Sequence, residues 1–138
     1  MRKLISKLML AAIVSGLLGA LVIPAAAGWA GNNTCNTTSG ICVSLDDNNG
    51  VPRAVTCCSD NTYVGDKYFN TTTNIDNTVS SVRNAFAGND VTFHVNTNGG
   101  GDSFCQDSGT QDNDLGWFGS DFDDKLSSHN KSAGDGVC

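Results

Sequence analysis

The sequence predicts an all-β domain, either a sandwich or a barrel, with Greek-key connections. No window after residue 27 shows a helical hydrophobic period. Short apolar or aromatic runs instead alternate with turn clusters rich in Asn, Asp and Gly, such as residues 46–50 and 96–101. All fourteen acidic residues are Asp, which favours turns, and the helix-forming Glu does not occur. Short strands at this spacing are typical of all-β sandwiches and barrels.

Seven runs are expected to form the strands, because each combines apolar or β-branched residues and is bounded by turn residues. His94 is expected on a strand, and the Gly-rich cluster 98–102 is expected to be a hairpin turn. Trp29 and Trp117 are expected to be core or edge aromatics. In chain order the runs are 40–45, 53–57, 61–69, 79–86, 91–96, 103–106 and 115–119.

The first 27 residues have the layout of a secretory signal peptide. Three basic residues precede an apolar run of 16 residues, and small residues then offer a cleavage site after Ala27 or, almost as well, after Ala30. A membrane anchor is the alternative, but the run is shorter than the roughly 20 residues that span a bilayer. We therefore expect a secreted, extracellular protein that has no membrane association after cleavage.

The exported chain is strongly acidic. Without the three basic residues of the signal peptide, five Lys and Arg face fourteen Asp, which gives a net charge of −9. A charge of this sign argues against nucleic acid as a partner and is compatible with the binding of cations. The length of residues 28–138 suits one domain with one core, and we expect a monomer.

The cysteines indicate a disulfide framework, since all six follow the signal peptide and an even number in an oxidising compartment is expected to pair. The sequence does not choose among the pairings. A local bridge between Cys35 and Cys42 is preferred, and the adjacent Cys57 and Cys58 are expected to pair outward, toward Cys105 and Cys138. No C-x-x-C motif supports a metal site at these cysteines.

The chain contains an internal repeat. Residues 43–50 and 93–100 both place Asn five positions after an apolar strand residue and Gly two positions later. A hexapeptide follows each: DNTVSS at 76–81, here the first hexapeptide, and DDKLSS at 123–128, the second hexapeptide. The domain is therefore expected over residues 42–130, as two packed units of about 42–84 and 91–130. Residues 28–41 form an N-terminal segment, and residues 131–138 form a C-terminal tail that ends in Cys138.

The repeated hexapeptides predict calcium binding. Calcium takes about six to eight oxygen ligands, and one hexapeptide supplies several of them but not a full shell. Two-fold packing of the units would let each ion take ligands from both hexapeptides, which predicts two ions. Turn capping by Asp and Ser is the alternative explanation. An EF-hand is excluded, because Gly116 and Trp117 stand at the wrong positions after Asp112 and no Glu exists to close the site.

The hexapeptides resemble the calcium-binding stretch of microbial βγ-crystallin domains, which pair two Greek-key motifs in a sandwich and hold two calcium ions in a double clamp. The resemblance covers most of residues 42–130. The companion signature of that family, an aromatic, four residues, a second aromatic, one residue and Gly, is incomplete here. Phe93 and Gly100 fit, but Asn98 replaces the second aromatic, and only Gly50 remains in the first unit.

The resemblance also implies a set of ligands by position. It implies side-chain ligands from the first two residues of each hexapeptide, a carbonyl from the third and a hydroxyl from the fifth. The sixth residues, Ser81 and Ser128, are expected to bond backbone instead. The implied ligands are the side chains of Asp76, Asn77, Asp123 and Asp124, the carbonyls of Thr78 and Lys125, and the hydroxyls of Ser80 and Ser127.

A narrower resemblance concerns function. A signal peptide, one two-motif crystallin-like domain and several cysteines are similar to the secreted actinobacterial proteins of peptidase inhibitor family I36. That resemblance implies a secreted thermolysin-like metalloprotease as the partner, with a rigid loop presented to it. Cys42-Val43 is one candidate for this loop. The alternative is a calcium-stabilised structural or stress protein without a protease target.

An enzyme is not expected. No Ser lies in a G-x-S-x-G pattern, and a turn-rich domain of this size leaves little room for a substrate cleft. His94 and His129 are the two histidines, and His129, directly after the second hexapeptide, is expected to be solvent-exposed.

Overall fold

The computed structural model describes residues 29, 35, 40–117, 121–133 and 138, and all structural statements concern these residues. They form seven strands and one short 3-10 turn. The predicted signal peptide lies outside them. The strands are β1 (Ile41–Ser44), β2 (Arg53–Thr56), β3 (Ser81–Asn84), β4 (Asn89–His94), β5 (Ser103–Gln106), β6 (Gln111–Asp112) and β7 (Ser128–Ala133), and the turn η1 (Thr97–Gly99) follows β4.

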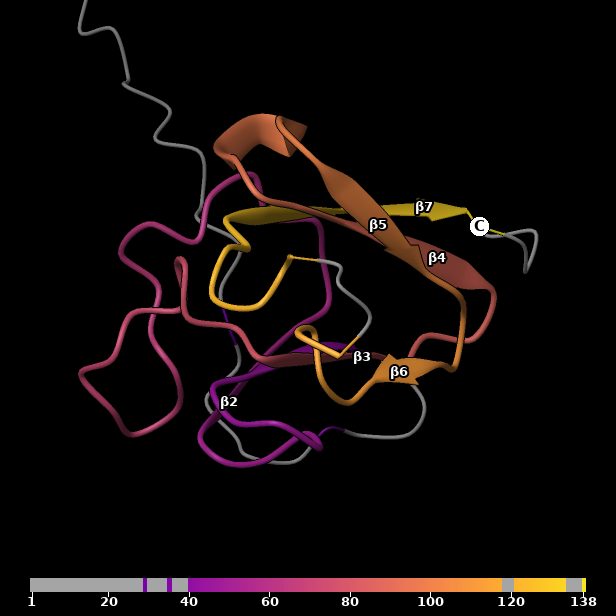
Figure 1. Ribbon diagram of the computed structural model, residues 1–138. Coiled ribbons are helices and arrows are strands. Elements are labelled where there is room, and N and C mark those ends of the chain that lie inside the picture. Colours follow the sequence, from indigo (N-terminus) through magenta and orange to yellow (C-terminus); the bar gives the residue numbers. More distant parts are fainter. Residues whose placement is uncertain (1–28, 30–34, 36–39, 118–120, 134–137) are drawn as a thin grey trace, which may run out of the picture.

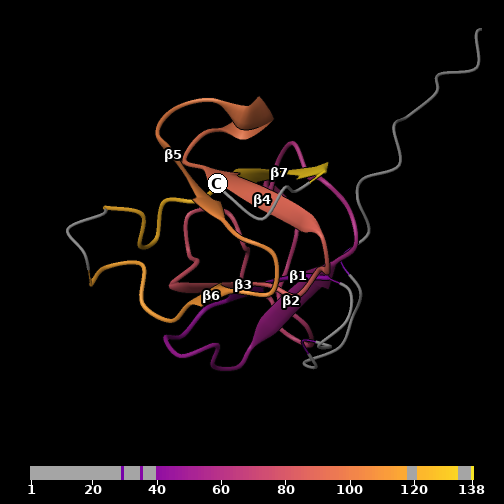
Figure 2. The ribbon, with the colours of Figure 1, turned by 90° about the vertical axis from the view of Figure 1, so that its right-hand side faces the viewer.

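The strands form two antiparallel sheets that lie as two layers, with β4, β5 and β7 in one and β1, β2, β3 and β6 in the other (Figures 1 and 2). The first sheet has the order β2-β1-β3-β6 and the second the order β5-β4-β7. The predicted all-β fold with two Greek-key units is confirmed. β6, from the second unit, pairs with β3 of the first, and Asp60, from the first unit, pairs with His129 on β7. Each unit therefore contributes one extended segment to the sheet of the other unit, β6 in one case and the segment at Asp60 in the other.

The core lies between the two layers. β1 contributes Ile41 and Val43, and β4 contributes Val91 and Phe93, all of them inaccessible to solvent. β-Branched and aromatic side chains pack well on a pleated sheet, which explains why these runs form strands. The Phe93 ring stacks on Phe104 of β5 with centroids 5.3 Å apart. Burial of this apolar surface is the main force that holds the layers together.

Two of the expected strands are wrong, and two observed strands were not expected. Residues 61–69 form a loop with only an isolated bridge, Lys67 to Asn74, and residues 115–117 form a turn. β6 is too short to show a period, while β7 buries Ser128 and His129 in place of apolar side chains. Polar burial of this kind gives no hydrophobic alternation, so the sequence pattern could not reveal these strands.

One of the observed disulfides matches the pairing that was predicted from the sequence. Cys35 pairs with Cys42 as predicted, whereas Cys57 pairs with its neighbour Cys58, and Cys105 pairs with Cys138. The expected outward pairing of Cys57 and Cys58 is therefore wrong. The physical reason is the strand order: these residues lie beside β7, and β4 separates β7 from β5, which carries Cys105.

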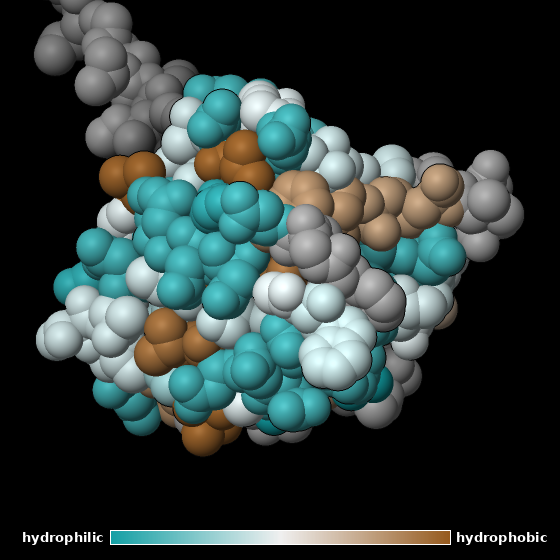
Figure 3. Space-filling view, viewed as in Figure 1, coloured by the Kyte–Doolittle hydropathy of each residue, from teal (hydrophilic) through white to brown (hydrophobic). Residues whose placement is uncertain are grey.

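The molecular surface in Figure 3 is mostly hydrophilic, with apolar residues in small separate areas. Val51, Val64 and Trp117 are the large apolar side chains exposed among the described residues. Within the same residues, no helix is long and apolar enough to cross a membrane.

Candidate functional site

The two hexapeptides lie side by side and exchange a pair of backbone hydrogen bonds. The N–H of Asn77 donates to the carbonyl of Leu126 over 3.0 Å, and the N–H of Asp124 donates to the carbonyl of Val79 over 3.1 Å. Asn77 and Asp124 are second positions, and Val79 and Leu126 are fourth positions. The contact therefore has local two-fold symmetry, as the sequence repeat predicts, and the buried Val79 and Leu126 side chains anchor it in the core.

The second position of each hexapeptide has a left-handed backbone. Asn77 and Asp124 both have φ of 55°. Asn and Asp enter this region at a lower cost than other residues with a Cβ, because their short polar side chains hydrogen-bond locally. Part of the hexapeptide pattern thus serves the turn itself.

The sixth position fastens each hexapeptide to a neighbouring loop. Ser81 Oγ donates to the carbonyl of Asp46 over 2.7 Å, and Ser128 Oγ donates to the carbonyl of Asn96 over 2.6 Å. Each hydroxyl also accepts a backbone N–H from the same loop, over 3.0 and 3.2 Å respectively. The expectation that these serines bond backbone is confirmed. The loops after β1 and β4 are thereby held against the hexapeptides.

Asp76 has a carboxylate oxygen that lacks a partner. Its Oδ1 is buried and makes no hydrogen bond, whereas its Oδ2 accepts from the Asn77 amide over 3.0 Å. The Asn77 Oδ1 lies 3.4 Å from Ser127 Oγ of the second hexapeptide. A buried anionic oxygen without a partner is costly, and a bound cation would offset that cost. Both hexapeptides thus contribute oxygen atoms to the region next to Asp76.

The side chains around the second hexapeptide are far more acidic. Partial desolvation and then repulsion from Asp114, Asp123 and Asp46 raise the pKa of Asp47, and desolvation and then Asp123 raise the pKa of Asp124. A cavity of about 430 Å³ opens beside this cluster, and no Lys or Arg lines it. Its lining residues are Asp47, Asn48, Gln111, Asp112, Asn113, Asp114 and Trp117.

The two halves of the site carry unequal charge. The symmetry of the backbone bonds assigns each residue in the half of the site with Asp123, Asp124 and Ser80 an equivalent in the half with Asp76, Asn77 and Ser127. For example, Leu115 donates to Ser80 as Tyr63 donates to Ser127. By this correspondence Asp46, Asp47, Asp114, Asp123 and Asp124 are matched by Asn96, Thr97, Thr62, Asp76 and Asn77. At these five matched positions, one half of the site has five carboxylates and the other half has only that of Asp76.

The third positions differ in how they are bonded. The carbonyl of Thr78 accepts from the Tyr68 hydroxyl over 3.0 Å, which leaves it one free lone pair. The Lys125 ammonium forms an ion pair with the exposed carboxylate of Asp121. Ser80, at the fifth position, is fixed through its backbone N–H, which donates to Ser44 over 3.0 Å.

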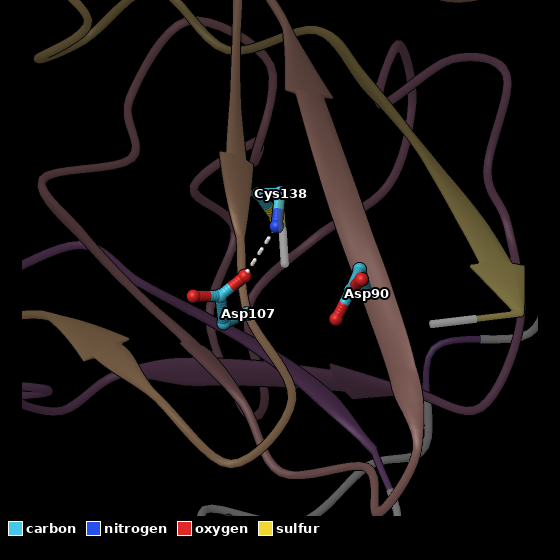
Figure 4. Close-up of side chains that lie close together, drawn as sticks. All are labelled: Asp90, Asp107 and Cys138. Carbon is cyan, nitrogen blue, oxygen red and sulfur yellow. Dashed lines mark hydrogen bonds between the residues drawn. The ribbon is translucent and has the colours of Figure 1, made fainter. Parts of the chain in front are cut away.

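A second group of possible ligands lies at the other side of the molecule, around Asp90, Asp107 and Cys138, with the ligand atoms within 4.8 Å of one another (Figure 4). The Cys138 sulfur is bonded to Cys105, so it offers no thiolate. Asp107 accepts the Cys138 N–H over 2.8 Å, and Asp90 accepts the Ser108 N–H over 3.1 Å. The disulfide to Cys105 and the bond to Asp107 hold the C-terminal cysteine at the end of β5, and the Asp90 carboxylate serves the loop at Ser108.

His129 is buried, which contradicts the expectation of solvent exposure. Its Nε2 donates to the carbonyl of Cys58 over 2.8 Å, and its Nδ1 accepts from the Tyr63 hydroxyl over 2.7 Å. Burial lowers the pKa of His129 to about 4. β7 begins directly at the end of the second hexapeptide, and the His129 ring lies in the core, beside the rings of Tyr63 and Phe93.

Comparison with known proteins adds the fold family. No family model and no curated protein matches the sequence. A structure described as "Evolution of the eye lens beta-gamma-crystallin domain fold" aligns with a TM-score of 0.59 at 14% identity, over 77% of this chain and 94% of that chain. The chain has the βγ-crystallin fold. The βγ-crystallin domains of Clostridium beijerinckii and Flavobacterium johnsoniae align with TM-scores of 0.53 and 0.52 at 18% and 21% identity.

These two bacterial βγ-crystallin domains are covered almost completely, over 99% and 98% of their lengths, by 69% and 71% of this chain. A βγ-crystallin domain therefore accounts for most of the described residues. The same fold corrects one expectation about the inhibitory loop. Cys42 and Val43 lie in β1, an inner strand of the first sheet, and are fully buried, so they cannot enter a protease cleft.

Proposed function

We propose that this protein is a secreted calcium-binding protein of the βγ-crystallin fold, without enzymatic activity, and that it holds two ions at the paired hexapeptides. The observation that supports the proposal most directly is the buried, unpartnered Oδ1 of Asp76 next to oxygen atoms from the other hexapeptide. Turn capping alone leaves this oxygen without a role, because a capping carboxylate accepts from a backbone N–H.

Each ion would take ligands from both hexapeptides. The first ion uses the Asp76 and Asn77 side chains together with Ser127, and the second uses Asp123, Asp124 and Ser80. The carbonyls of the third residues, Thr78 and Lys125, complete part of the two shells. Oxygen ligands of these kinds match the preference of calcium for carboxylate, carbonyl and hydroxyl groups.

Calorimetric titration of calcium into the oxidised chain tests this proposal. Two sites are expected, with Asp76→Ala weakening the first and Asp123→Ala weakening the second. Asp102→Ala, at an exposed Asp before β5, is the matched control and should leave both sites unchanged. If no heat of binding and no calcium-dependent rise in melting temperature are observed, the proposal is rejected, and the hexapeptides serve only to stabilise turns.

We further propose that the protein inhibits a thermolysin-like metalloprotease through the loop that carries Val64. Proteases of this type favour an apolar residue after the scissile bond, and the Val64 side chain is 63% exposed. The loop is held firmly, since the preceding Tyr63 is fully buried and its carbonyl accepts the N–H of Asp66 over 3.1 Å. A loop ordered before binding loses less entropy when it binds.

Inhibition of thermolysin at a known molar ratio tests the loop. The wild-type chain should slow the protease stoichiometrically and stay intact, while Val64→Asp should relieve inhibition. Val51→Asp, a change at another exposed valine, should leave inhibition intact. If the calcium-loaded chain resists digestion but does not inhibit thermolysin, the second candidate is favoured, a calcium-stabilised structural or stress protein. The hexapeptides join the two units, so ion binding there would stabilise the native state.

A further inference from the structure

A disulfide between adjacent residues lies where the first unit crosses to the second sheet. Cys57 and Cys58 directly follow β2, and both are exposed to solvent. Two residues later, Asp60 pairs with His129 on β7 through reciprocal backbone hydrogen bonds of 2.9 and 2.8 Å. We call residues 57–60 the crossing segment.

Side chains of β7 bind the backbone of the crossing segment. The buried His129 Nε2 donates to the carbonyl of Cys58 over 2.8 Å, and the Lys131 ammonium donates to the carbonyl of Cys57 over 3.3 Å. The N–H of Lys131 also donates to Ser59 Oγ over 2.8 Å. Both carbonyls of the disulfide pair thus serve as acceptors for one strand.

The Cys57–Cys58 bond contributes little as a global cross-link. A disulfide stabilises the folded state mainly by restricting the unfolded chain, and this effect grows with the length of the closed loop. Adjacent cysteines close the shortest loop possible, whereas Cys105 and Cys138 are separated by 33 positions. The main effect of the adjacent pair is therefore local: its ring contains the Cys57–Cys58 peptide group, whose carbonyl receives Lys131, and it holds the Cα of Cys58, whose own carbonyl receives His129.

The surroundings of this disulfide favour reaction with a thiolate. Both sulfurs belong to exposed residues, and exposed disulfides are the ones more readily reduced. The Lys131 ammonium, bonded to Cys57 and positioned over the Phe86 ring at 4.4 Å, places a cation beside the pair in a chain of strongly negative charge. A nearby cation attracts an attacking thiolate and stabilises the thiolate that leaves.

We propose that Cys57–Cys58 is a thiol–disulfide exchange site that accepts electrons from a dithiol, and that its reduction releases the crossing segment from β7. One thiolate of the dithiol attacks a protein sulfur to form a mixed disulfide, and the other protein sulfur leaves as a thiolate and takes up a proton. The second thiol of the dithiol then displaces the remaining protein sulfur. The protein disulfide becomes two thiols, and the dithiol becomes a cyclic disulfide.

Release of the crossing segment should also loosen the end of the second hexapeptide. When the ring opens, the Cys57–Cys58 peptide group and the N–Cα bond of Cys58 can rotate. The Cys58 carbonyl, which follows that Cα, can then leave His129, whose buried Nε2–H lacks an acceptor. His129 follows Ser128, the last residue of the second hexapeptide, so the start of β7 and the hexapeptide should loosen together. This last step, a weaker first calcium site, which takes Ser127 from this end of the second hexapeptide, rests on the proposed calcium binding; the release itself does not.

Graded reduction of the full chain by dithiothreitol, with alkylation and mass spectrometric mapping, tests the exchange site. Alkylation is expected at Cys57 and Cys58 before the other cysteines. Hydrogen exchange then tests the release: the amides of Asp60 and His129 should exchange at least about tenfold faster after reduction, because their bonds open locally. A Cys57→Ser/Cys58→Ser variant should reproduce this change without reductant, and a Cys105→Ser/Cys138→Ser variant should not.

The proposal is overturned if Cys57 and Cys58 stay oxidised while another pair is reduced, if mapping shows that they pair elsewhere, or if the Asp60 and His129 amides keep their exchange rates after reduction. Calcium titration of the reduced chain is a separate readout. A chain that binds no calcium at all but shows the faster exchange would reject the proposed calcium function and retain the exchange site.

Discussion

Asn77 and Asp124 occupy the same position in the two hexapeptides, share φ of 55°, and each donates its N–H to the fourth residue of the other hexapeptide. This reciprocity makes the two segments one structural unit. Any change that alters the backbone of one hexapeptide should therefore also alter the conformation of the other.

Replacement of Asn77 separates its backbone role from its side-chain role. Asn77→Val should lower the free energy of unfolding by about 1–2 kcal/mol in calcium-free buffer, because a β-branched residue is strained in the left-handed region. Asn77→Gly keeps this backbone accessible and should cost less. Urea unfolding with a chelator measures the stability of both variants. Equal losses of unfolding free energy would show that the left-handed backbone is not the reason for Asn at position 77.

The two calcium sites should differ in affinity. The site at Asp123 and Asp124 has the larger negative charge, so it should fill first and weaken more as salt is added. Asp47→Asn should lower the affinity of this site only. Thr97→Asp, at the equivalent position of the other unit, should raise the affinity of the first site severalfold. Titration at low and high salt checks the order, and two equal sites with equal salt dependence would contradict it.

Adjacent serines should behave differently. Ser81→Ala removes a buried hydroxyl that joins two backbone groups, and it should lower the free energy of unfolding by about 1–3 kcal/mol. Ser80→Ala should change stability much less but weaken the second calcium site. Chemical unfolding without calcium, followed by titration of the same samples, separates the two effects. A loss of stability in Ser80→Ala as large as that in Ser81→Ala would oppose the assignment.

Stability should fall on mild acidification because of His129. Its pKa is about 4 in the folded protein and about 6.5 in an unfolded chain, so the unfolded state binds more protons between these values. The stabilisation by neutral His129 is complete above pH 6.5 and is lost as the pH falls toward 4, by up to about 3 kcal/mol. Burial and the Asp60 carboxylate raise the pKa of Asp66 to about 6, which acts in the opposite direction.

Comparison of the wild-type chain with His129→Gln isolates the histidine, since Asp66 is common to both. The difference in unfolding free energy between them should shrink as the pH falls from 6.5 to 4. A difference that is independent of pH would show that His129 does not titrate on unfolding.

The sequence predicted the features that repeat or alternate. The strands at 41–44, 53–56 and 89–94 follow apolar and β-branched runs, and the paired units follow the two hexapeptides. The bridge from Cys35 to Cys42 was predicted as a local pair. These features depend on residue type and spacing, which can be read from one chain.

The features that the sequence did not predict depend on which segments meet across the fold. β7 gives no apolar signal because its buried side chains are Ser128 and His129, whose bonding partners come from distant loops. Cys57 and Cys58 are kept from Cys105 because the crossing segment lies beside β7 and β4 separates β7 from β5, and this strand order cannot be read from the sequence. The uneven charge of the two halves of the proposed calcium site also appears only when loops after β1 and β6 are placed beside Asp123.

The exchange of edge segments between the units has a consequence for the integrity of each half. If the chain were cut between β3 and β4, the first fragment would keep β3 without its β6 partner, and the second would keep β7 without the segment at Asp60. Each fragment would present an open sheet edge that the other is shaped to close. The two halves are thus expected to act as complementary fragments, insoluble or unfolded when separate and capable of reassembly when mixed.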